Sequence, residues 1–436
     1  MITLWAKTLV EHRDDGACVP LRLYCWDGGT CYTEVNVDES QCGARGLLHT
    51  CCGHAPADIA AVGTDDIQVH VFAGWERAAP SQPSGTGGSS GSSGAVGLVR
   101  QNGVWEQMPV QIVPLREELF SRVTGLFETD VLADVCVFCA GLGSVGAPVA
   151  EEEAKSGIGN FILMDHDRIE VANVIRHVAG LCDIGRYKTR FMAERIRNRN
   201  PYAKTETHEV KIAWETEELV RQRVRKSDIV IGAVDDSLAR TILNKVCVAE
   251  RKPLIIPGVF RRAYGCQILF VREPGVTPCY NCFLMTLPQM EENREISSPE
   301  QAQRTAYSDR PVAVEPGLSV DIAPAVTMTA KLVTTHLLKG KPTTMRSLEE
   351  DLTAPWYMYL NRREAGTDFE RLEPLGFKVG DAPHILSWWG IDLKRNPACP
   401  VCGDYVGEMA KRYGIPRGEG DGKPSEDPGE GAKDGD

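Results

Sequence analysis

The sequence predicts an α/β protein built on a doubly wound, Rossmann-like and mostly parallel sheet. Three observations predict this fold class. Residues 133–141 (ADVCVFCAG) form a nearly continuous apolar run, as expected of a strand buried on both faces. This run leads into the glycine pattern Gly141-x-Gly143-x-x-Gly146, which opens a helix-like segment. Strand-like and helix-like segments then alternate, a pattern that favours right-handed crossovers between parallel strands.

The elements of this region follow one another along the chain. Strands are predicted over 133–141, 159–167, 205–212, 227–234, 252–260 and 264–271. Helices are predicted over 144–155, 186–199, 215–226, 237–250 and 323–339, with Gly340 as the C-cap of the last one. The aromatic segments 355–360 and 385–393 are interpreted as strands that pack back on the core.

A chain of 436 residues is long enough for two or three domains. Residues 1–79 contain short alternating stretches, which predict a small β-rich N-terminal domain whose role the sequence does not indicate. Residues 80–103 include SQPSGTGGSSGSSGAVG and are interpreted as a Gly/Ser linker, or else as a long loop within one unit. The rest is predicted as an α/β domain over 104–340, C-terminal strands over 341–410 and a disordered acidic tail over 411–436.

Composition excludes several classes of function. The formal net charge of −12 argues against a general nucleic-acid binder, which normally carries a basic surface. No apolar run approaches the roughly 20 residues that span a bilayer. The first residues, MITLWAKTLVEHRDD, lack the basic-then-apolar pattern of a secretory signal. We therefore expect a cytoplasmic protein that binds neither nucleic acid nor membrane.

The glycine pattern and one acidic residue predict a nucleotide site. Gly141, Gly143 and Gly146 permit a tight turn and close approach of phosphate to the backbone. Asp165 ends the next strand, 19 residues after Gly146, where a carboxylate can hold a ribose hydroxyl. Taken alone, these features are typical of a nicotinamide-dependent oxidoreductase.

The charged residues that follow indicate a different reaction. MDHDRIEVANVIRH supplies Asp165, Asp167, Asn173 and Arg176, and DIGRYKTR adds Lys188. AVDDSLAR places Asp235 and Asp236 after another strand, where a carboxylate can hold Mg²⁺. All of them fall at strand-to-helix turns on one edge of the sheet. This set suits attack on a nucleoside triphosphate, because negative charge builds up on the departing pyrophosphate.

The order of these motifs resembles one family. GxGxxG, D-x-D-x-x-x-x-x-N-x-x-R, D-x-G-x-x-K, V-D-D and paired CxxC motifs together resemble the ThiF/MoeB/HesA family, which includes the ubiquitin-activating enzymes. The resemblance covers residues 115–285, the region near 315–340 and the stretch 396–403. It implies a ThiF/MoeB-type adenylation domain that uses ATP and Mg²⁺ to activate the C-terminal carboxylate of a ubiquitin-like protein ending in glycine, releasing pyrophosphate.

Other functions remain open beside this one. The pathway is either bacterial-type ubiquitin-like conjugation, with a conjugating-enzyme homologue as a further partner, or sulfur transfer. A small-molecule or peptide adenylyltransferase of the same family is one alternative. A non-catalytic subunit that binds a ubiquitin-like protein is another, although retention of Asp165, Arg176, Lys188 and Asp235 argues against it.

The resemblance also implies roles for individual residues. Gly141, Gly143 and Gly146 would lie against ATP, Asp165 would bind the ribose, and Asn173, Arg176 and Lys188 would contact phosphates. Asp235 would coordinate Mg²⁺, with Asp167 and Asp236 in the same nucleotide site. The family is dimeric, and Arg122 in REELFSR resembles the arginine that reaches into the partner subunit's active site, although Ser121 replaces the usual asparagine. The resemblance therefore implies a homodimer in which Arg122 acts in trans.

Two pairs of cysteines predict a structural metal site. Cys279, Cys282, Cys399 and Cys402 form two CxxC pairs, which suit tetrahedral Zn²⁺ with no open position. A redox function is disfavoured, because neither pair opens a helix after a strand in a thioredoxin-like setting. Four others fall within predicted strands or helices and are interpreted as core residues: Cys136, Cys139, Cys247 and Cys266. The six cysteines at 18, 25, 31, 42, 51 and 52 are interpreted as free thiols rather than metal ligands.

One expected residue is missing. Activating enzymes that form a thioester carry a cysteine between the first CxxC pair and the following helix. Residues 283–322 contain no cysteine, and Ala313 stands about where that nucleophile would be. Alanine cannot attack an adenylate. If this protein forms a thioester, the remaining candidates are Cys182 and, in the N-terminal segment, Cys51 and Cys52.

Overall fold

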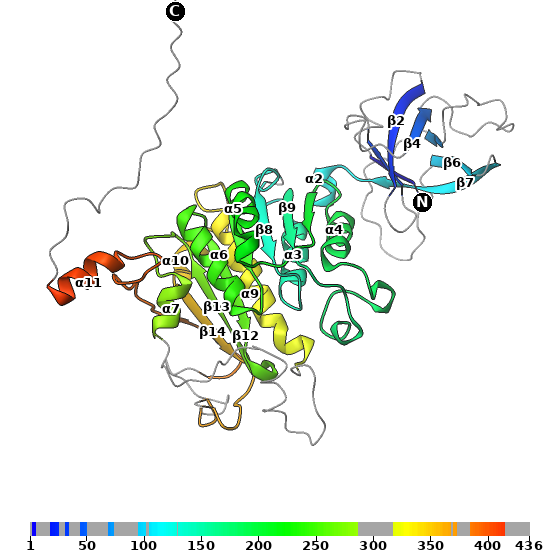
Figure 1. Ribbon diagram of the computed structural model, residues 1–436. Helices are drawn as coiled ribbons and strands as arrows, with labels where there is room; N and C mark the ends of the chain where they lie inside the picture. The colour runs from blue at the N-terminus through cyan, green and yellow to red at the C-terminus, as the bar shows by residue number, and fades with distance from the viewer. Residues whose placement is uncertain are drawn as a thin grey trace, which may run out of the picture. The chain divides into compact units, whose positions relative to one another are not determined.

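A computed structural model describes residues 2–5, 18–25, 31–34, 44–49, 69–73, 95–101, 104–128, 130–286, 317–367, 369–372 and 384–414. The chain divides into two compact units, Met1–Thr124 and Gly125–Asp436. Figure 1 labels the helices and strands of both units. Within the described ranges, none of the helices combines the length and apolarity needed to cross a membrane.

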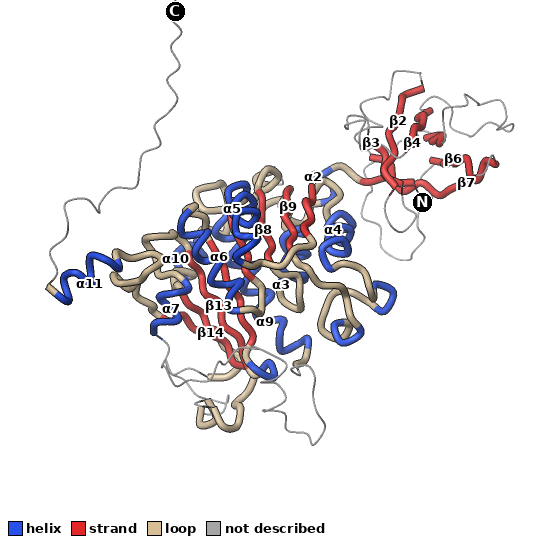
Figure 2. The backbone as a smooth tube through the Cα atoms, viewed as in Figure 1, coloured by secondary structure: helices blue, strands red, loops and turns tan. Residues whose placement is uncertain are grey.

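The first unit contains a closed β-barrel, whose strands are red in Figure 2. Its strands are β1 (Ile2–Trp5), β2 (Cys18–Cys25), β3 (Cys31–Glu34), β4 (Ala44–His49), β5 (Val69–Ala73), β6 (Ala95–Gln101) and β7 (Val104–Val113). They follow the order β1-β3-β2-β4-β5-β6-β7, and parallel pairing of β1 with β7 closes the barrel. Closure removes the exposed strand edges that an open sheet would present.

The strands on either side of the Gly- and Ser-rich stretch belong to the same barrel. β6 begins at Ala95, inside the range 80–103 that the sequence analysis interpreted as a linker, and it pairs with both β5 and β7. β7, which was expected in the α/β domain, is therefore a barrel strand, and the boundary between the units falls after Thr124. The strands before and after this stretch, β5 and β6, thus lie in one unit.

The second unit is centred on a mixed sheet with the strand order β10-β9-β8-β11-β12-β13-β14-β15. The strands are β8 (Cys136–Ala140), β9 (Asn160–Met164), β10 (Lys204–His208), β11 (Ile229–Gly232), β12 (Leu254–Val259), β13 (Gly265–Val271), β14 (Trp356–Leu360) and β15 (Trp388–Ile391). The neighbouring strands in the part β10-β9-β8-β11-β12 pair in parallel. The neighbouring strands in the part β12-β13-β14-β15 pair antiparallel. The predicted mostly parallel α/β sheet is thus confirmed, and the two aromatic segments form its antiparallel end.

Helices cover both faces of this sheet (Figure 1). One layer contains α3 (Gly146–Lys155), α4 (Lys188–Arg199) and α9 (Ser319–Leu337), and the other contains α5 (Glu217–Lys226), α6 (Ser237–Ala249) and α7 (Tyr280–Thr286). The shorter helices are α2 (Arg116–Leu119), α10 (Ser347–Asp351) and α11 (Tyr405–Tyr413). Phe138, Ile162 and Val230 share one buried cluster with α5 and α6. Their strand neighbours are also buried and face the other layer, because successive side chains on a strand alternate.

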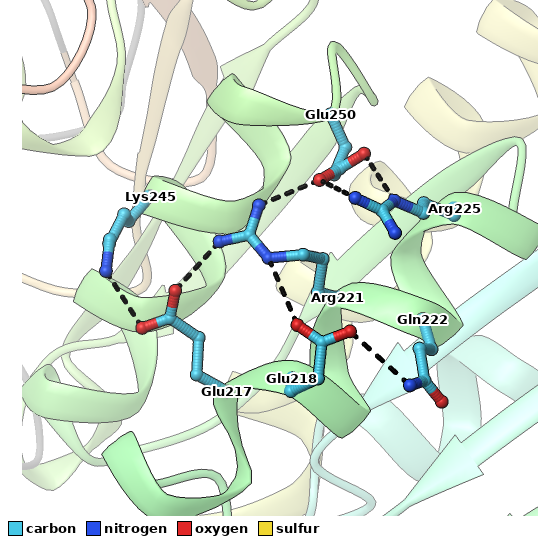
Figure 3. Close-up of polar contacts among 7 residues, drawn as sticks. All are labelled: Glu217, Glu218, Arg221, Gln222, Arg225, Lys245 and Glu250. Atoms are coloured by element: carbon cyan, nitrogen blue, oxygen red, sulfur yellow. Dashed lines mark hydrogen bonds and ion pairs between the residues drawn. The ribbon is translucent and has the colours of Figure 1, made fainter. Parts of the chain in front are cut away.

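A network of ion pairs joins α5 to α6 (Figure 3). Arg221 lies between two carboxylates, 2.8 Å from Glu217 Oε1 and 2.8 Å from Glu250 Oε1. Lys245 contacts Glu217 at 2.9 Å, and Arg225 contacts Glu250 at 2.8 Å. The hydrogen bond from Lys245 lowers the pKa of Glu217, and that from Arg225 lowers the pKa of Glu250. Because several charges share partners, we expect this network to stabilise the helix pair more than an isolated surface ion pair would.

Candidate functional site

A cleft of about 320 Å³ lies at the carboxyl ends of β8, β9, β11 and β12. Nine of the residues predicted for the nucleotide site line it: Gly141, Gly143, Asp165, Asp167, Asn173, Arg176, Lys188, Asp235 and Asp236. Gly146 is the first residue of α3, behind the glycine loop. The carboxyl edge of a parallel sheet is where α/β proteins bind ligands. Arg122 follows α2 in the other unit and is exposed, and its role stays a prediction.

A different structural feature explains why glycine occupies each of the three positions of the loop. Gly141 has φ +86°, and a Cβ there would stand 2.5 Å from the carbonyl oxygen of Ala233. A Cβ on Gly146 would lie 2.0 Å from the carbonyl oxygen of Gly141, so α3 can pack this close only without a side chain. A Cβ on Gly143 would meet no atom within 4 Å. Gly143 therefore leaves open space beside the backbone, as a phosphate needs.

Two side chains hold the peptide groups on either side of Leu142. Asp165 Oδ2 accepts the backbone N–H of Leu142 at 2.7 Å, while its Oδ1 accepts that of Asp167 at 2.8 Å. His177 Nδ1 accepts the N–H of Ala179 at 3.0 Å, so its Nε2 carries the proton and donates to the Leu142 carbonyl at 2.8 Å. Burial lowers the pKa of His177, which favours this neutral form. No motif marked His177, although it directly follows Arg176.

The cations that line the cleft, Arg176, Lys188, Lys211 and Arg240, come from four segments. Lys188, at the start of α4, is 8% exposed, and its Nζ lies 2.8 Å from Asp167 Oδ2. Burial acts to raise the pKa of Asp167, but the hydrogen bond and charge of Lys188 outweigh it and lower that pKa overall. Arg176 lines the cleft beside Asn173, whose Oδ1 accepts the N–H of Glu170 at 2.9 Å, which leaves its amide NH₂ group as the part suited to a phosphate. Lys211 follows β10, and Arg240 lies on α6.

The segment after β10 departs from the sequence prediction. A strand was expected over 205–212, but β10 ends at His208, and Val210, Lys211 and Ile212 line the cleft. β10 is an edge strand whose single partner, β9, ends at Met164 opposite His208, so no strand is left for the following residues to pair with. Sequence reasoning missed Lys211 because the alternating pattern predicted that it would lie on the sheet.

Asp235 and Asp236 differ in their contacts. Asp236 caps α6, since its Oδ1 accepts the N–H of Leu238 at 2.9 Å. Asp235 lines the cleft immediately before this cap. Mg²⁺ in nucleotide sites typically takes one or two carboxylates and completes its shell with phosphate and water oxygens. A carboxylate at this wall of the cleft fits that ion, and the cap makes Asp235 the better candidate of the two.

The four predicted zinc cysteines lie together and are buried. Sγ–Sγ distances are 4.0 Å for Cys279–Cys282, 3.7 Å for Cys279–Cys399 and 3.4 Å for Cys282–Cys402. Tetrahedral zinc with Zn–S bonds of about 2.3 Å requires thiolates about 3.8 Å apart. The N–H of Asn396 points to Cys282 Sγ at 3.3 Å, and hydrogen bonds from Cys279, Cys402 and this N–H lower the pKa of Cys282. The predicted grouping is confirmed, and its donor set fits structural zinc.

The remaining described cysteines do not form part of the cleft. Cys139, Cys247 and Cys266 are fully buried, and burial raises the pKa of the half-buried Cys136 to about 11. Cys182 is exposed, with its Sγ 3.9 Å from Asp183 Oδ2. Among the described residues, no cysteine lines the cleft. Residues 51, 52 and 313, which the sequence analysis discussed as thioester positions, lie outside the described residues.

The sheet, the glycine loop and the charged cleft define a Rossmann-like protein with a nucleotide-type site. The profile of the ThiF family matches residues 116–353, more than half of the chain, and the chain belongs to this family.

Curated relatives are similar over part of their length. The ubiquitin-like modifier-activating enzyme 5 of Dictyostelium discoideum is 30% identical over 160 residues, which cover 35% of this chain and 42% of that protein. The sulfur carrier protein ThiS adenylyltransferase of Escherichia coli K12 is 29% identical over 182 residues, covering 42% of this chain and 67% of that protein. The crystal structure of E. coli MccB matches with a TM-score of 0.46 at 22% identity, covering 63% of this chain and 67% of that chain. This chain thus spans less than half the length of the Dictyostelium relative.

Proposed function

We propose that this chain is an ATP-dependent adenylyltransferase that activates the C-terminal carboxylate of a ubiquitin-like protein ending in glycine. One observation carries the proposal: a single cleft combines a glycine loop open at Gly143, the cations Arg176, Lys188 and Lys211, and the carboxylates Asp165 and Asp235. Similarity to an enzyme named for ubiquitin-like modifiers and to one named for a sulfur carrier protein supports the substrate class.

The geometry supports a direct displacement. ATP would lie with its phosphates against the glycine loop and the N-terminus of α3, and with its ribose toward Asp165. A carboxylate oxygen of the substrate attacks the α-phosphorus, the bond from this phosphorus to the bridging oxygen breaks, and its electron pair leaves with pyrophosphate. Arg176 and Lys188 stabilise the charge that grows on the leaving group. Mg²⁺ held at Asp235 would supply further neutralisation.

Asp167 positions the side chain of Lys188 for this stabilisation of the leaving group. Their ion pair, at 2.8 Å, holds the lysine in the cleft before nucleotide binds. A preorganised cation requires less reorganisation when charge develops on the phosphates. The homodimer belongs to the same proposal, with Arg122 of one subunit adding a cation to the site of the other.

The fate of the acyl-adenylate follows from the missing cysteine. Because residues 283–322 contain no thiol, the adenylate passes either to a sulfur donor, to a conjugating-enzyme homologue, or to a cysteine elsewhere in the chain. Non-reducing gels after addition of ATP distinguish the last route from the other two, since only the last gives a reducible adduct of this chain with its substrate.

Pyrophosphate exchange tests the proposal. Purified chain should incorporate labelled pyrophosphate into ATP when a ubiquitin-like protein encoded beside its gene is present, and not when that protein lacks its terminal glycine. Asp235→Ala and Lys188→Ala should each lower the exchange rate by a factor of about 100 or more. Arg190→Ala is the matched control, because Arg190 lies on the same helix as Lys188 but bonds Glu209 at 3.0 Å.

Two results would redirect the proposal. Exchange with a small molecule or free peptide, and with no ubiquitin-like protein, would assign the chain to the alternative class of adenylyltransferases. Binding of a ubiquitin-like protein without any exchange would make the chain a non-catalytic subunit and contradict the proposed activity.

A further inference from the structure

Helix α6 carries two buried polar side chains on one face. Arg240 is 5% exposed and Asn244 is 1% exposed. Residues four apart lie above one another on a helix, so both face the same neighbour. A charged guanidinium and an amide cost folding free energy when buried unless they are hydrogen-bonded. The partners of these two side chains therefore show what the face is built to hold.

Arg240 holds the turn that carries Asp235. Its Nε donates to the backbone carbonyl of Val234 at 2.9 Å, and Val234 and Asp235 both line the cleft. The guanidinium also hydrogen-bonds the side chain of Tyr280, which is 4% exposed. Arginine has no acceptor atom, so the Tyr280 hydroxyl oxygen accepts this bond.

Asn244 contacts the backbone of Tyr280 and the neighbouring Cys279. Its Oδ1 accepts the backbone N–H of Tyr280 at 3.0 Å, and its side chain also hydrogen-bonds the thiol of Cys279. Cys279 belongs to the four-cysteine cluster and directly precedes Tyr280. A continuous set of contacts thus runs from the cluster through Tyr280 and Arg240 to the residue before Asp235.

We infer that Arg240 and Tyr280 are positioning residues that couple the four-cysteine metal site to the turn bearing Asp235. A metal bound to Cys279 fixes the first turn of α7, the Tyr280 hydroxyl then orients the guanidinium, and the guanidinium holds the Val234 carbonyl. Loss of the metal releases this turn while the sheet stays folded. The coupling rests on the proposed function where it assigns Mg²⁺ and ATP to Asp235.

One conservative substitution isolates the connection. Tyr280→Phe removes the hydroxyl that accepts from Arg240 and keeps the ring, whose centroid lies 6.1 Å from that of Phe283. Arg221→Gln is the matched control, because it breaks a different arginine contact to the α6 end, at Glu250, without touching Val234 (Figure 3). Metal analysis of the zinc-loaded full chain should show that both variants retain the metal, since neither substitution removes a cysteine of the cluster.

Two measurements follow the turn itself. Hydrogen exchange of the nucleotide-free chain over residues 232–240 should be about five-fold faster in Tyr280→Phe than in wild type, the effect of losing roughly one hydrogen bond. The Mg²⁺ concentration for half-maximal ATP binding should rise by a similar factor of about five. Arg221→Gln should change neither quantity. Removing zinc from wild type should speed the same exchange, and removing it from Tyr280→Phe should add little, because the connection is already broken.

The outcomes separate the coupling from the proposed function. Equal exchange at 232–240 in wild type and Tyr280→Phe overturns the coupling, whatever the result with ATP. Equal acceleration in Arg221→Gln also overturns it, because α6 then loosens as a whole. If exchange changes as expected but wild type binds no ATP with Mg²⁺, the coupling stands and the proposed function fails.

Discussion

Asp165 accepts the backbone N–H of Leu142 at 2.7 Å, and this hydrogen bond joins the end of β9 to the glycine loop after β8. The carboxylate expected to bind a ribose is therefore also part of the structure that shapes the phosphate loop. His177 completes the arrangement from the other side, since it donates to the Leu142 carbonyl at 2.8 Å. The loop is thus held in position before any nucleotide arrives.

The first prediction concerns this double use of Asp165. In Asp165→Asn, one of the two backbone N–H groups now bonded to the carboxylate would face an amide NH₂. An unpaired backbone donor of this kind costs about 1–3 kcal/mol. We expect both a lower urea midpoint and at least ten-fold weaker ATP binding, measured by calorimetry. A variant that loses ATP affinity at unchanged stability would show that Asp165 acts on the ribose alone.

Sequence patterns led to several residues that line the cleft, but not to the strand pairing across the Gly- and Ser-rich stretch. Residues such as Gly141, Asp165 and Asp235 were recognisable because each follows an apolar strand, and parallel strands bring their carboxyl ends to one edge. His177, Lys211 and Arg240 were not recognised. Their roles depend on which backbone group or loop comes near them, and neither periodicity nor motif spacing encodes that.

The barrel shows the same limit on a larger scale. A Gly- and Ser-rich stretch has the composition of a linker whether it joins two domains or two strands of one sheet. The pairing of β6 with β5 distinguishes these cases, and these two strands are separated in sequence by residues 74–94. The four zinc cysteines were predictable although Cys282 and Cys399 lie much farther apart in sequence, because each CxxC pair is a local motif that indicates metal binding by itself.

The second prediction concerns acid stability. His336 lies against Phe270 with ring centroids 5.3 Å apart, and burial together with Arg272 and Lys339 lowers its pKa to about 4. Between pH 6.5 and 4 the unfolded chain binds a proton at this residue and the folded chain does not, so stability falls as the pH falls through this window. The loss amounts to about 3 kcal/mol once both states are protonated.

Urea unfolding at pH 5.0 and pH 7.5 measures the effect. His336→Gln should be more stable relative to wild type at pH 5.0 than at pH 7.5, while His166→Gln, whose side chain is half exposed, should show no such gain. The pH dependence that remains in His336→Gln combines two opposite effects, because burial lowers the pKa of His177 and raises the pKa of Glu153. A slope of wild-type size in that variant would contradict the assignment.

The third prediction concerns a carboxyl group between α3 and α9. Glu153 is fully buried, its Oε2 accepts from Thr334 at 3.2 Å, and burial raises its pKa well above the ordinary value. Above pH 4.5 the unfolded chain releases this proton first, so rising pH reduces stability. Glu153→Gln keeps the size of the side chain and an oxygen for Thr334 but cannot ionise.

We expect the melting temperature of Glu153→Gln at pH 7.5 to exceed that of wild type by about 2–4 °C, the equivalent of ~1 kcal/mol. The advantage should vanish near pH 4, where the wild-type carboxyl is protonated in both states. Glu152→Gln serves as the control, because its neighbouring carboxylate is exposed and pairs with Lys155 at 2.7 Å. A lower melting temperature for Glu153→Gln at both pH values would show that the added NH₂ group, rather than the charge, determines stability there.

The fourth prediction concerns the metal itself. The four buried thiols have Sγ–Sγ distances of 3.4 to 4.0 Å, far longer than a disulfide bond of about 2.05 Å and close to tetrahedral zinc. Without an ion, buried cysteines are largely neutral thiols with weak mutual contacts, whereas Zn²⁺ bound to all four would link α7 to the C-terminal segment. We expect one zinc ion per chain by elemental analysis, and a fall in melting temperature of several degrees after chelation.

Cys399→Ser should lose the metal, whereas Cys182→Ser should retain it, because Cys182 is an exposed thiol outside the cluster. A metal-free wild type with an unchanged melting temperature would show that packing alone, through buried residues such as Leu393 and Tyr280, holds this part of the fold.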